Sequence, residues 1–172
     1  MERVLISSCL LGLPVRYHGG DARIESEIVH RWVAEGRVVS ICPEVRAGLG
    51  VPRPAAEIIG ANGFAVLDGF AVVVDDRGND GTRLFVAGAQ EALHLAQSFN
   101  VRVAVLKDGS PSCGRTFIYN GQFRGLKKRG EMGVTAAILQ RNGVAVFSEN
   151  QIVDAEKRLR ELESTLRMGA SR

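Results

Sequence analysis

Residues 84–106 read LFVAGAQEALHLAQSFNVRVAVL, and this segment already indicates the fold class. Its first part, Leu84–Phe99, has apolar residues at positions 85, 89, 92, 93, 96 and 99, the spacing of a helix with one buried face. Its second part, Val101–Leu106, is a short apolar run that predicts a buried strand. Short apolar strands that alternate with helices are typical of a parallel sheet covered on both sides.

The same alternation extends in both directions along the chain. Further strands are predicted at Arg3–Ser7, Arg37–Ile41 and Val144–Phe147, and further helices at about 22–35, 133–141 and 151–167, the last with Leu159, Leu162 and Leu166 on one side. Two turn signals, Asp68-Gly69 and Asn120-Gly121, predict hairpins that pair Phe64–Asp68 with Ala71–Asp75 and Phe117–Tyr119 with Gln122–Phe123. We therefore expect a three-layer, Rossmann-like α/β fold: a mainly parallel sheet with helices on both faces and inserted β-hairpins.

Composition narrows the class of protein. The chain has 172 residues, 45% hydrophobic and 24% charged, which excludes a disordered chain and suits a single domain over residues 1–172. The net charge of +3 does not require an extended nucleic-acid surface. We expect no membrane span, since there is no run of about 18 apolar residues, and Val4–Ile6 is too short for a signal peptide. An odd number of cysteines favours a reducing compartment, so a cytoplasmic location is expected.

The three cysteines are the most informative residues. Cys9, Cys42 and Cys113 each follow a predicted strand, and the carboxyl ends of parallel strands meet at one edge of a sheet, where ligands bind. Thiolates select zinc, copper(I) or iron–sulfur clusters. Zinc would need a fourth ligand, for which His18 lies in a loop at the same edge. A 4Fe–4S cluster held by three cysteines would leave one iron open, as catalytic centres do.

Polar residues near these cysteines suggest catalytic and binding groups. Glu44 lies two positions after Cys42 and can move protons. Ser110 and Ser112 lie in the turn before Cys113 and can donate hydrogen bonds to a substrate or to cluster sulfurs. Three loop cations are candidates to meet an anion: Arg16, Arg53 and Lys127.

These residues belong to blocks that resemble a known family. The blocks are Ser8–Gly12 with Arg16–Gly20, Cys42–Glu44 with Gly48-Leu49 and Pro52–Pro54, Ser110–Gly114 with Ile118–Gly121, and Gly133–Ala136 with Phe147–Glu149. In this order they resemble the thiouracil desulfidases (TudS), formerly a domain of unknown function. The resemblance runs from about residue 3 to residue 150.

The resemblance implies a non-redox, 4Fe–4S-dependent desulfidase. Cys9, Cys42 and Cys113 would hold the cluster, and the open iron would bind the thiocarbonyl sulfur of a thiolated uracil compound. Water deprotonated by Glu44 would replace the sulfur, which leaves as hydrosulfide. Ser110 would bind the pyrimidine or relay the proton, with Ser112 as the alternative.

The implied substrates are small thiolated pyrimidines. They are thiouracil and 4-thiouridine monophosphate, a tRNA breakdown product. Arg53 or Lys127 would bind the phosphate of the latter. No stable nucleic-acid partner is expected, and the protein is a monomer or a homodimer. An exposed cluster with an open iron is oxygen-labile, so protein prepared in air is expected to lose it.

Two other functions remain open at the level of sequence. One is a non-enzymatic iron–sulfur module for redox or sensing, which would bind iron without turning over thiolated uracils. The other is a zinc-dependent hydrolase with His18 as the fourth ligand. Metal analysis distinguishes the zinc-dependent hydrolase from the cluster enzyme. An activity assay distinguishes the non-enzymatic module from it.

Overall fold

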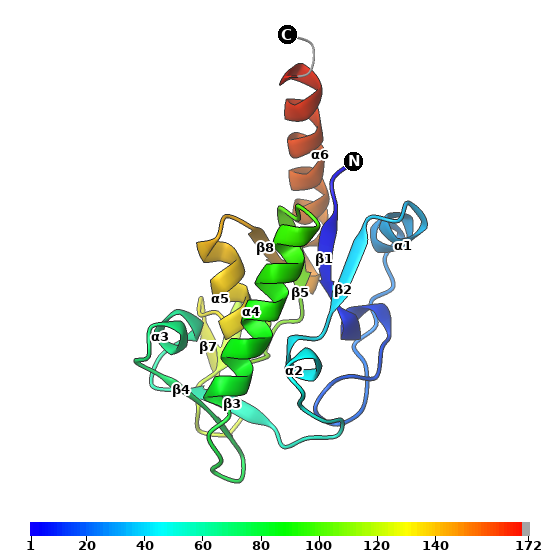
Figure 1. Cartoon of the computed structure of the whole chain (residues 1–172). Helices are drawn as coiled ribbons and strands as arrows, with labels where there is room; N and C mark the ends of the chain where they lie inside the picture. The colour runs from blue at the N-terminus through cyan, green and yellow to red at the C-terminus, as the bar shows by residue number, and fades with distance from the viewer. Residues whose placement is uncertain (170–172) are drawn as a thin grey trace.

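The centre of the fold is a four-stranded parallel sheet (Figure 1). The computed structural model describes the backbone of residues 1–169 and the side chains of residues 1–165. The strand order is β2-β1-β5-β8, with β1 at Val4–Ser7, β2 at Val38–Ile41, β5 at Val103–Leu106 and β8 at Ala145–Ser148. All three pairings are parallel, so the predicted parallel sheet is confirmed.

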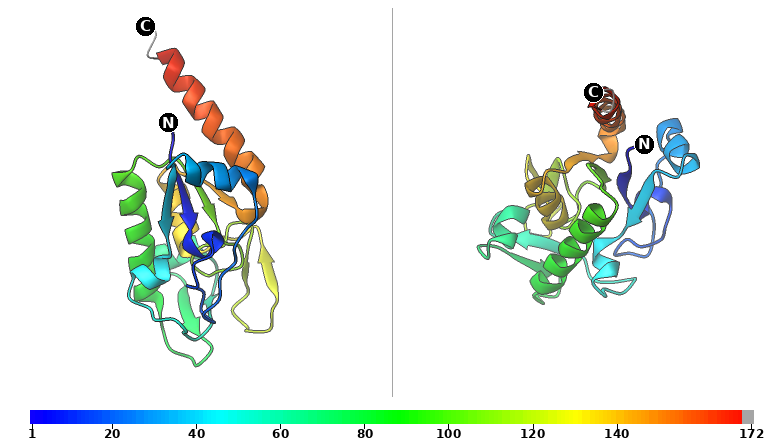
Figure 2. Two further views of the ribbon diagram at one scale, coloured as in Figure 1. Left: turned by 90° about the vertical axis from the view of Figure 1, so that its right-hand side faces the viewer. Right: turned by 45° about the horizontal axis from the view of Figure 1, so that its top comes forward.

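Helices cover both faces of this sheet, which confirms the three layers (Figure 2). On one face lie α4 (Thr82–Ser98) and α5 (Val134–Arg141), which pack on Leu5, Ala104 and Leu106. On the other lie α1 (Glu27–Ala34) and α6 (Ile152–Gly169), which pack on Val4, Ile6, Val103 and Val105. Successive strand residues point to opposite faces, so each short strand contributes to both cores.

One predicted helix begins later in the structure than expected, and the buried side of another is confirmed over its described residues. The helix expected at 22–35 begins only at Glu27, because Ser26 caps it: the Ser26 hydroxyl accepts a hydrogen bond from the Val29 backbone N–H at 3.5 Å. In α6, Leu159 and Leu162 are buried as expected. The side chain of Leu166, predicted on the same side, lies outside the described residues.

An internal carboxylate joins α1 to α6. Trp32, the only tryptophan, is fully buried, and its Nε1 donates to Glu156 Oε2 at 2.7 Å. Burial raises the pKa of Glu156, but the hydrogen bonds from Arg160 and Trp32 and the charges of Arg31 and Arg160 together lower it more, so the pKa lies below its usual value. The negative charge of Glu156 therefore stabilises the contact between the two helices.

The first predicted hairpin has the right second strand, but the wrong first strand was predicted to pair with it. Residues Gly63–Leu67 form a short helix, α3, because the Asn62 side chain accepts a hydrogen bond from the Ala65 backbone N–H at 3.1 Å and caps it. The strand β4 (Val72–Asp75) pairs instead with β3 (Ala56–Ile59), antiparallel. An inserted antiparallel pair is thus present, with a helix inside its connection.

The second predicted hairpin has the right first strand and the wrong second strand. The strand β6 (Phe117–Tyr119) pairs with β7 (Lys127–Arg129) rather than with residues 122–123. The reason is Glu57, whose Oε2 accepts hydrogen bonds from the backbone N–H groups of Gly121 (2.7 Å) and Phe123 (3.1 Å). This carboxylate holds the connection as a wide loop, which prevents the tight two-residue turn.

In the part of the chain that the structure describes, no helix combines the length and the apolar character needed to cross a membrane.

Candidate functional site

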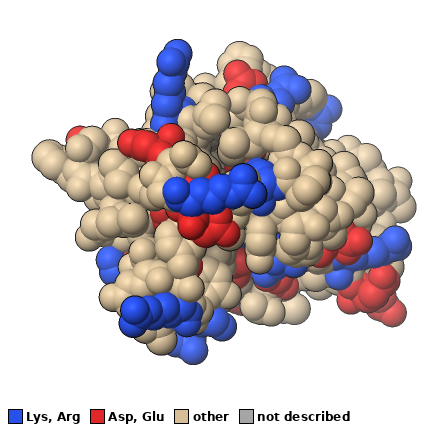
Figure 3. Space-filling view, turned by 90° about the horizontal axis from the view of Figure 1, so that it is seen from below, with Lys and Arg blue, Asp and Glu red and all other residues tan. Residues whose placement is uncertain are grey.

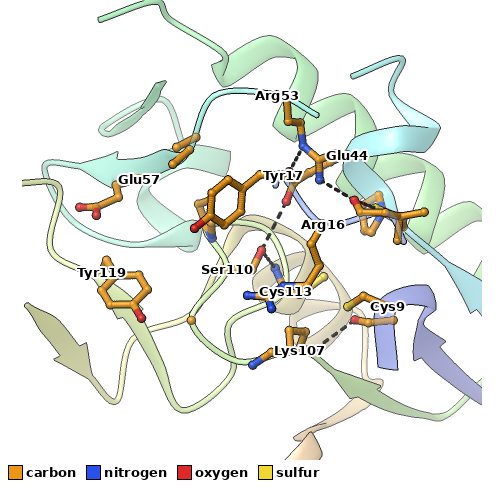
Figure 4. A pocket seen from close by; sticks show the side chains of 18 of the residues that line it. Cys9, Arg16, Tyr17, Glu44, Arg53, Glu57, Lys107, Ser110, Cys113 and Tyr119 are labelled. Atoms are coloured by element: carbon orange, nitrogen blue, oxygen red, sulfur yellow. Dashed lines mark hydrogen bonds and ion pairs between the residues drawn. The ribbon is translucent and has the colours of Figure 1, made fainter. Parts of the chain in front are cut away.

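The three cysteines meet at the carboxyl edge of the sheet, as predicted from the strand pattern. Cys9 lies in the short 3-10 helix η1 (Ser8–Leu11) after β1, Cys42 directly follows β2 at the start of helix α2 (Pro43–Arg46), and Cys113 lies in the loop after β5. All three line one cavity of about 590 Å³, and Figure 4 shows Cys9 and Cys113 in its wall. That volume suits a small ligand.

The cysteines fit a thiolate-bound metal group by their chemistry. None of the three is joined in a disulfide. Burial raises the pKa of Cys9 to about 11 and also raises the pKa of Cys113, and the charges of the neighbouring cysteines raise both. Three free thiols that line one cavity from three separate segments are a donor set that iron–sulfur clusters use.

The loop that bears Cys113 is fixed by the start of helix α5. The backbone N–H groups of Val134 and Thr135 donate to the carbonyls of Pro111 and Ser112 at 2.8 and 2.9 Å. The Ser112 hydroxyl lies 2.8 Å from the Thr135 hydroxyl, and both residues are fully buried. Ser112, predicted to bind substrate, is therefore not part of the cavity lining and anchors the loop instead.

Asp108 is a site residue that the sequence analysis missed. It is buried, and its Oδ1 accepts hydrogen bonds from the backbone N–H groups of Arg115 and Thr116, both at 2.8 Å. It thereby closes the loop around Cys113. The available signal was the Asp108-Gly109 pair, which begins two positions after the last residue of β5, since aspartate commonly bonds backbone N–H groups in turns.

Lys107 brings a positive charge to the cavity. Its Nζ donates to Glu149 Oε1 at 2.5 Å and to the Asp108 carbonyl at 3.1 Å. Glu149 begins the 3-10 helix η2 (Glu149–Gln151) after β8, and its Oε2 also accepts the Asp108 backbone N–H at 2.8 Å. The ammonium of Lys107 lowers the pKa of Cys9 and partly offsets its burial.

The two predicted catalytic residues lie together. Glu44 is in α2, and its Oε1 accepts a hydrogen bond from the Ser110 hydroxyl at 3.4 Å, while Oε2 accepts from Arg53 Nε at 2.7 Å (Figure 4). The Ser110 oxygen in turn accepts the backbone N–H groups of Ser112 (3.0 Å) and Cys113 (3.1 Å). The serine hydroxyl thus has its hydrogen free for the carboxylate.

The three residues predicted to bind an anion lie in different surroundings. Arg16 and Arg53 line the cavity, whereas Lys127 does not; its ammonium lies over the Phe117 ring, 4.3 Å from the centroid. Arg53 is paired with Glu44, while Arg16 makes no ion pair with any residue whose side chain is described. The face seen from below mixes basic and acidic side chains (Figure 3).

Aromatic side chains form the outer wall of the cavity. They are Tyr17, Phe117, Tyr119 and Phe123, and the rings of Phe117 and Tyr119 meet edge to face at 5.8 Å. Flat apolar surfaces of this kind suit stacking on a heterocyclic base.

His18 does not join the cysteines. It is exposed, its Nδ1 accepts the Gly20 backbone N–H at 3.1 Å, and it is absent from the cavity lining. Among the described side chains, no three His, Cys, Asp or Glu residues are grouped closely enough to share a single metal ion.

Comparison with known proteins shows the family of the chain. Residues 4–151 match the family described as 2-thiouracil desulfurase. The chain is 46% identical over 151 residues to the uncharacterized protein YbbK of Bacillus subtilis (strain 168), covering 88% of this chain and 98% of that protein. It also resembles the solved structure of the 4Fe-4S-dependent thiouracil desulfidase TudS, with a TM-score of 0.84 and 43% identity over 92% of this chain and 98% of that one. The expected fold and an enzyme class acting on a carbon–sulfur bond are thereby confirmed, and the chain belongs to the 2-thiouracil desulfurase family.

Proposed function

We propose that this protein is a 4Fe–4S-dependent desulfidase that hydrolyses thiolated uracil compounds, with 4-thiouridine monophosphate as a substrate. The observation that carries the proposal is the shared cavity of three cysteine sulfurs and the Glu44–Ser110 pair. Cys9, Cys42 and Cys113 would hold the cluster. When bound, the cluster would supply a Lewis-acidic iron for the thiocarbonyl sulfur of the substrate.

The chain's own residues supply the acid–base chemistry. Glu44 takes a proton from a water molecule, and the resulting hydroxide adds to the ring carbon that bears the sulfur. The Ser110 hydroxyl, which donates to Glu44 Oε1, orients the carboxylate and relays the proton to the departing sulfur. The net reaction converts a thiocarbonyl and water into a carbonyl and hydrogen sulfide, so no electron donor is needed.

The remaining cavity residues recognise the rest of the substrate. The aromatic wall of Tyr17, Phe117, Tyr119 and Phe123 stacks on the pyrimidine. Arg16 is the cavity arginine whose guanidinium is not held by a carboxylate among the described residues. It therefore meets the negative charge of the phosphate, a role that Arg53 cannot take while it is bound to Glu44.

The test is an anaerobic assay. Protein reconstituted with iron and sulfide is given 4-thiouridine monophosphate, and the thiocarbonyl absorbance and trapped sulfide are followed. We expect stoichiometric sulfide and uridine monophosphate, with a rate loss of about 100-fold or more in Glu44→Gln. The matched control is Glu91→Gln, a surface carboxylate 47% exposed and paired with Arg46. Protein that holds the cluster and leaves the thiocarbonyl unchanged would contradict the proposal.

A further inference from the structure

Arg53 is fully occupied by protein groups, although it lines the cavity. Its Nε donates to Glu44 Oε2 at 2.7 Å, its Nη1 to the Gly50 carbonyl at 3.1 Å and its Nη2 to the Val15 carbonyl at 3.0 Å. Only 7% of its side chain is exposed. The guanidinium therefore faces one carboxylate and two carbonyls, and each of its three nitrogens is already engaged.

These contacts connect three segments around the cavity. Val15 belongs to the loop after Cys9, Gly50 to the segment after α2, and Glu44 to α2 itself. The Arg53 backbone N–H also donates to the Tyr17 carbonyl at 2.8 Å. Hydrogen bonds thus hold both the backbone and the side chain of Arg53. They fix the position of Arg53 Nε, and this nitrogen in turn fixes the position of Glu44 Oε2.

Apart from Arg53, the Glu44 carboxylate has few polar contacts. The short helix α2 spans only Pro43–Arg46, and the second carboxylate oxygen has a single, longer hydrogen bond of 3.4 Å from Ser110. A carboxylate on a flexible three-bond side chain would turn away from a reacting water without a rigid partner. A planar guanidinium with several donors in fixed directions is such a partner.

We infer that Arg53 is a positioning residue: it holds the Glu44 carboxylate toward the reacting centre and acts only through it. This inference rests on the proposed function, in which Glu44 is the base. It replaces the phosphate-binding role that the sequence suggested for Arg53. The two roles differ in what they predict, since a phosphate ligand affects only phosphorylated substrates and a positioning residue affects every thiolated uracil.

The test uses two substrates, the free base 2-thiouracil and 4-thiouridine monophosphate, on the anaerobically reconstituted protein. For Arg53→Ala we expect kcat to fall by about 100-fold on both substrates, with KM changed by less than about threefold. Arg53→Lys keeps the charge without the fork of donors and is expected to recover part of the loss. Iron and sulfide content should equal those of the wild type.

A double-mutant cycle tests the route of action. In the Glu44→Gln variant, adding Arg53→Ala should lower kcat by less than about a further twofold, because Arg53 acts through Glu44. Millimolar guanidinium should restore activity to Arg53→Ala and leave Arg53→Ala/Glu44→Gln unchanged. The matched control is Arg46→Ala, since Arg46 pairs with Glu91 and is 63% exposed; its kcat should match the wild type.

The outcomes separate the two claims. A wild type that holds the cluster and desulfurises neither substrate overturns the proposed function, and the inference with it. An active wild type with a full-rate Arg53→Ala variant overturns the inference alone. The inference is also overturned if Arg53→Ala lowers kcat by the same factor in the wild type and in Glu44→Gln. It is overturned as well if the only effect of Arg53→Ala is a raised KM for the phosphorylated substrate.

Discussion

Replacing Ser112 by alanine removes one half of a buried hydroxyl pair. The two oxygens lie 2.8 Å apart, and Ser112 and Thr135 are 1% and 0% exposed. The Thr135 hydroxyl is left without a partner, which costs about 1–3 kcal/mol. One kcal/mol shifts Tm by about 2–4 °C in a protein of this size, so Ser112→Ala should lower Tm by about 2–12 °C.

A matched pair of variants isolates this hydrogen bond. Thr135→Val has nearly the same shape as threonine and should cost a similar free energy on its own. The double variant Ser112→Ala/Thr135→Val removes both polar groups together, so it should be markedly more stable than the sum of the single losses predicts.

The assay combines thermal unfolding, followed by far-ultraviolet circular dichroism, with the anaerobic activity measurement. KM for 4-thiouridine monophosphate should stay at the wild-type value in Ser112→Ala at temperatures well below Tm, because the side chain does not line the cavity. An unchanged Tm together with a raised KM would refute the anchoring role and return Ser112 to substrate binding.

Three further perturbations have expected outcomes. Replacing any one of the cavity cysteines by serine should abolish cluster incorporation, measured as iron and acid-labile sulfide per chain, and retention of a full cluster would contradict the ligand set. Gly88→Ala places a Cβ 2.3 Å from the Pro43 carbonyl oxygen, so α2 must shift. We expect the free energy of unfolding, measured in urea, to fall by about 1–3 kcal/mol and hydrosulfide to be released more slowly. Its control is Gly81→Ala, where the added Cβ meets only ordinary contacts, and equal behaviour of the two would count against the tight packing. Glu156→Gln should destabilise the protein at neutral pH by about 1–2 kcal/mol. The folded pKa of Glu156 is lowered, so its contribution is present above the ordinary value of 4.5 and is lost as the pH falls through the folded pKa. Trp32 fluorescence during urea unfolding should therefore show a difference from wild type that shrinks in acid, and a constant difference would argue against the charged contact.

The parallel sheet and its helices were predictable because their signals are local. Val101–Leu106 and the helix before it carry periodic apolar residues, and tertiary packing leaves that pattern intact. The convergence of the cysteines followed from topology alone, since every strand of the sheet runs in the same direction. Glu44 and Ser110 were candidates because each lies within three residues of a cysteine, and the structure places both in the wall of the same cavity.

The errors arose where a distant residue determines local structure. The Asn120-Gly121 signal predicts a tight turn, but Glu57, more than sixty positions earlier, holds that loop open. The hydrogen bonds of the Arg53 side chain involve carbonyls in two other segments, and the hydrogen bond of Ser112 involves a hydroxyl in α5. No pattern within a short window of sequence contains these partners, so only the folded chain identifies them.

The spacing of the cysteines has a consequence for how the protein is made. Cys9 and Cys42 are 33 positions apart and Cys113 lies 71 further on, so the three sulfurs meet only after β1 has paired with both β2 and β5. With these cysteines as the proposed ligands, an unfolded chain would therefore not bring all three thiols together to hold a cluster. Cluster insertion would then follow folding, and the cluster would enter through the mouth of the finished cavity.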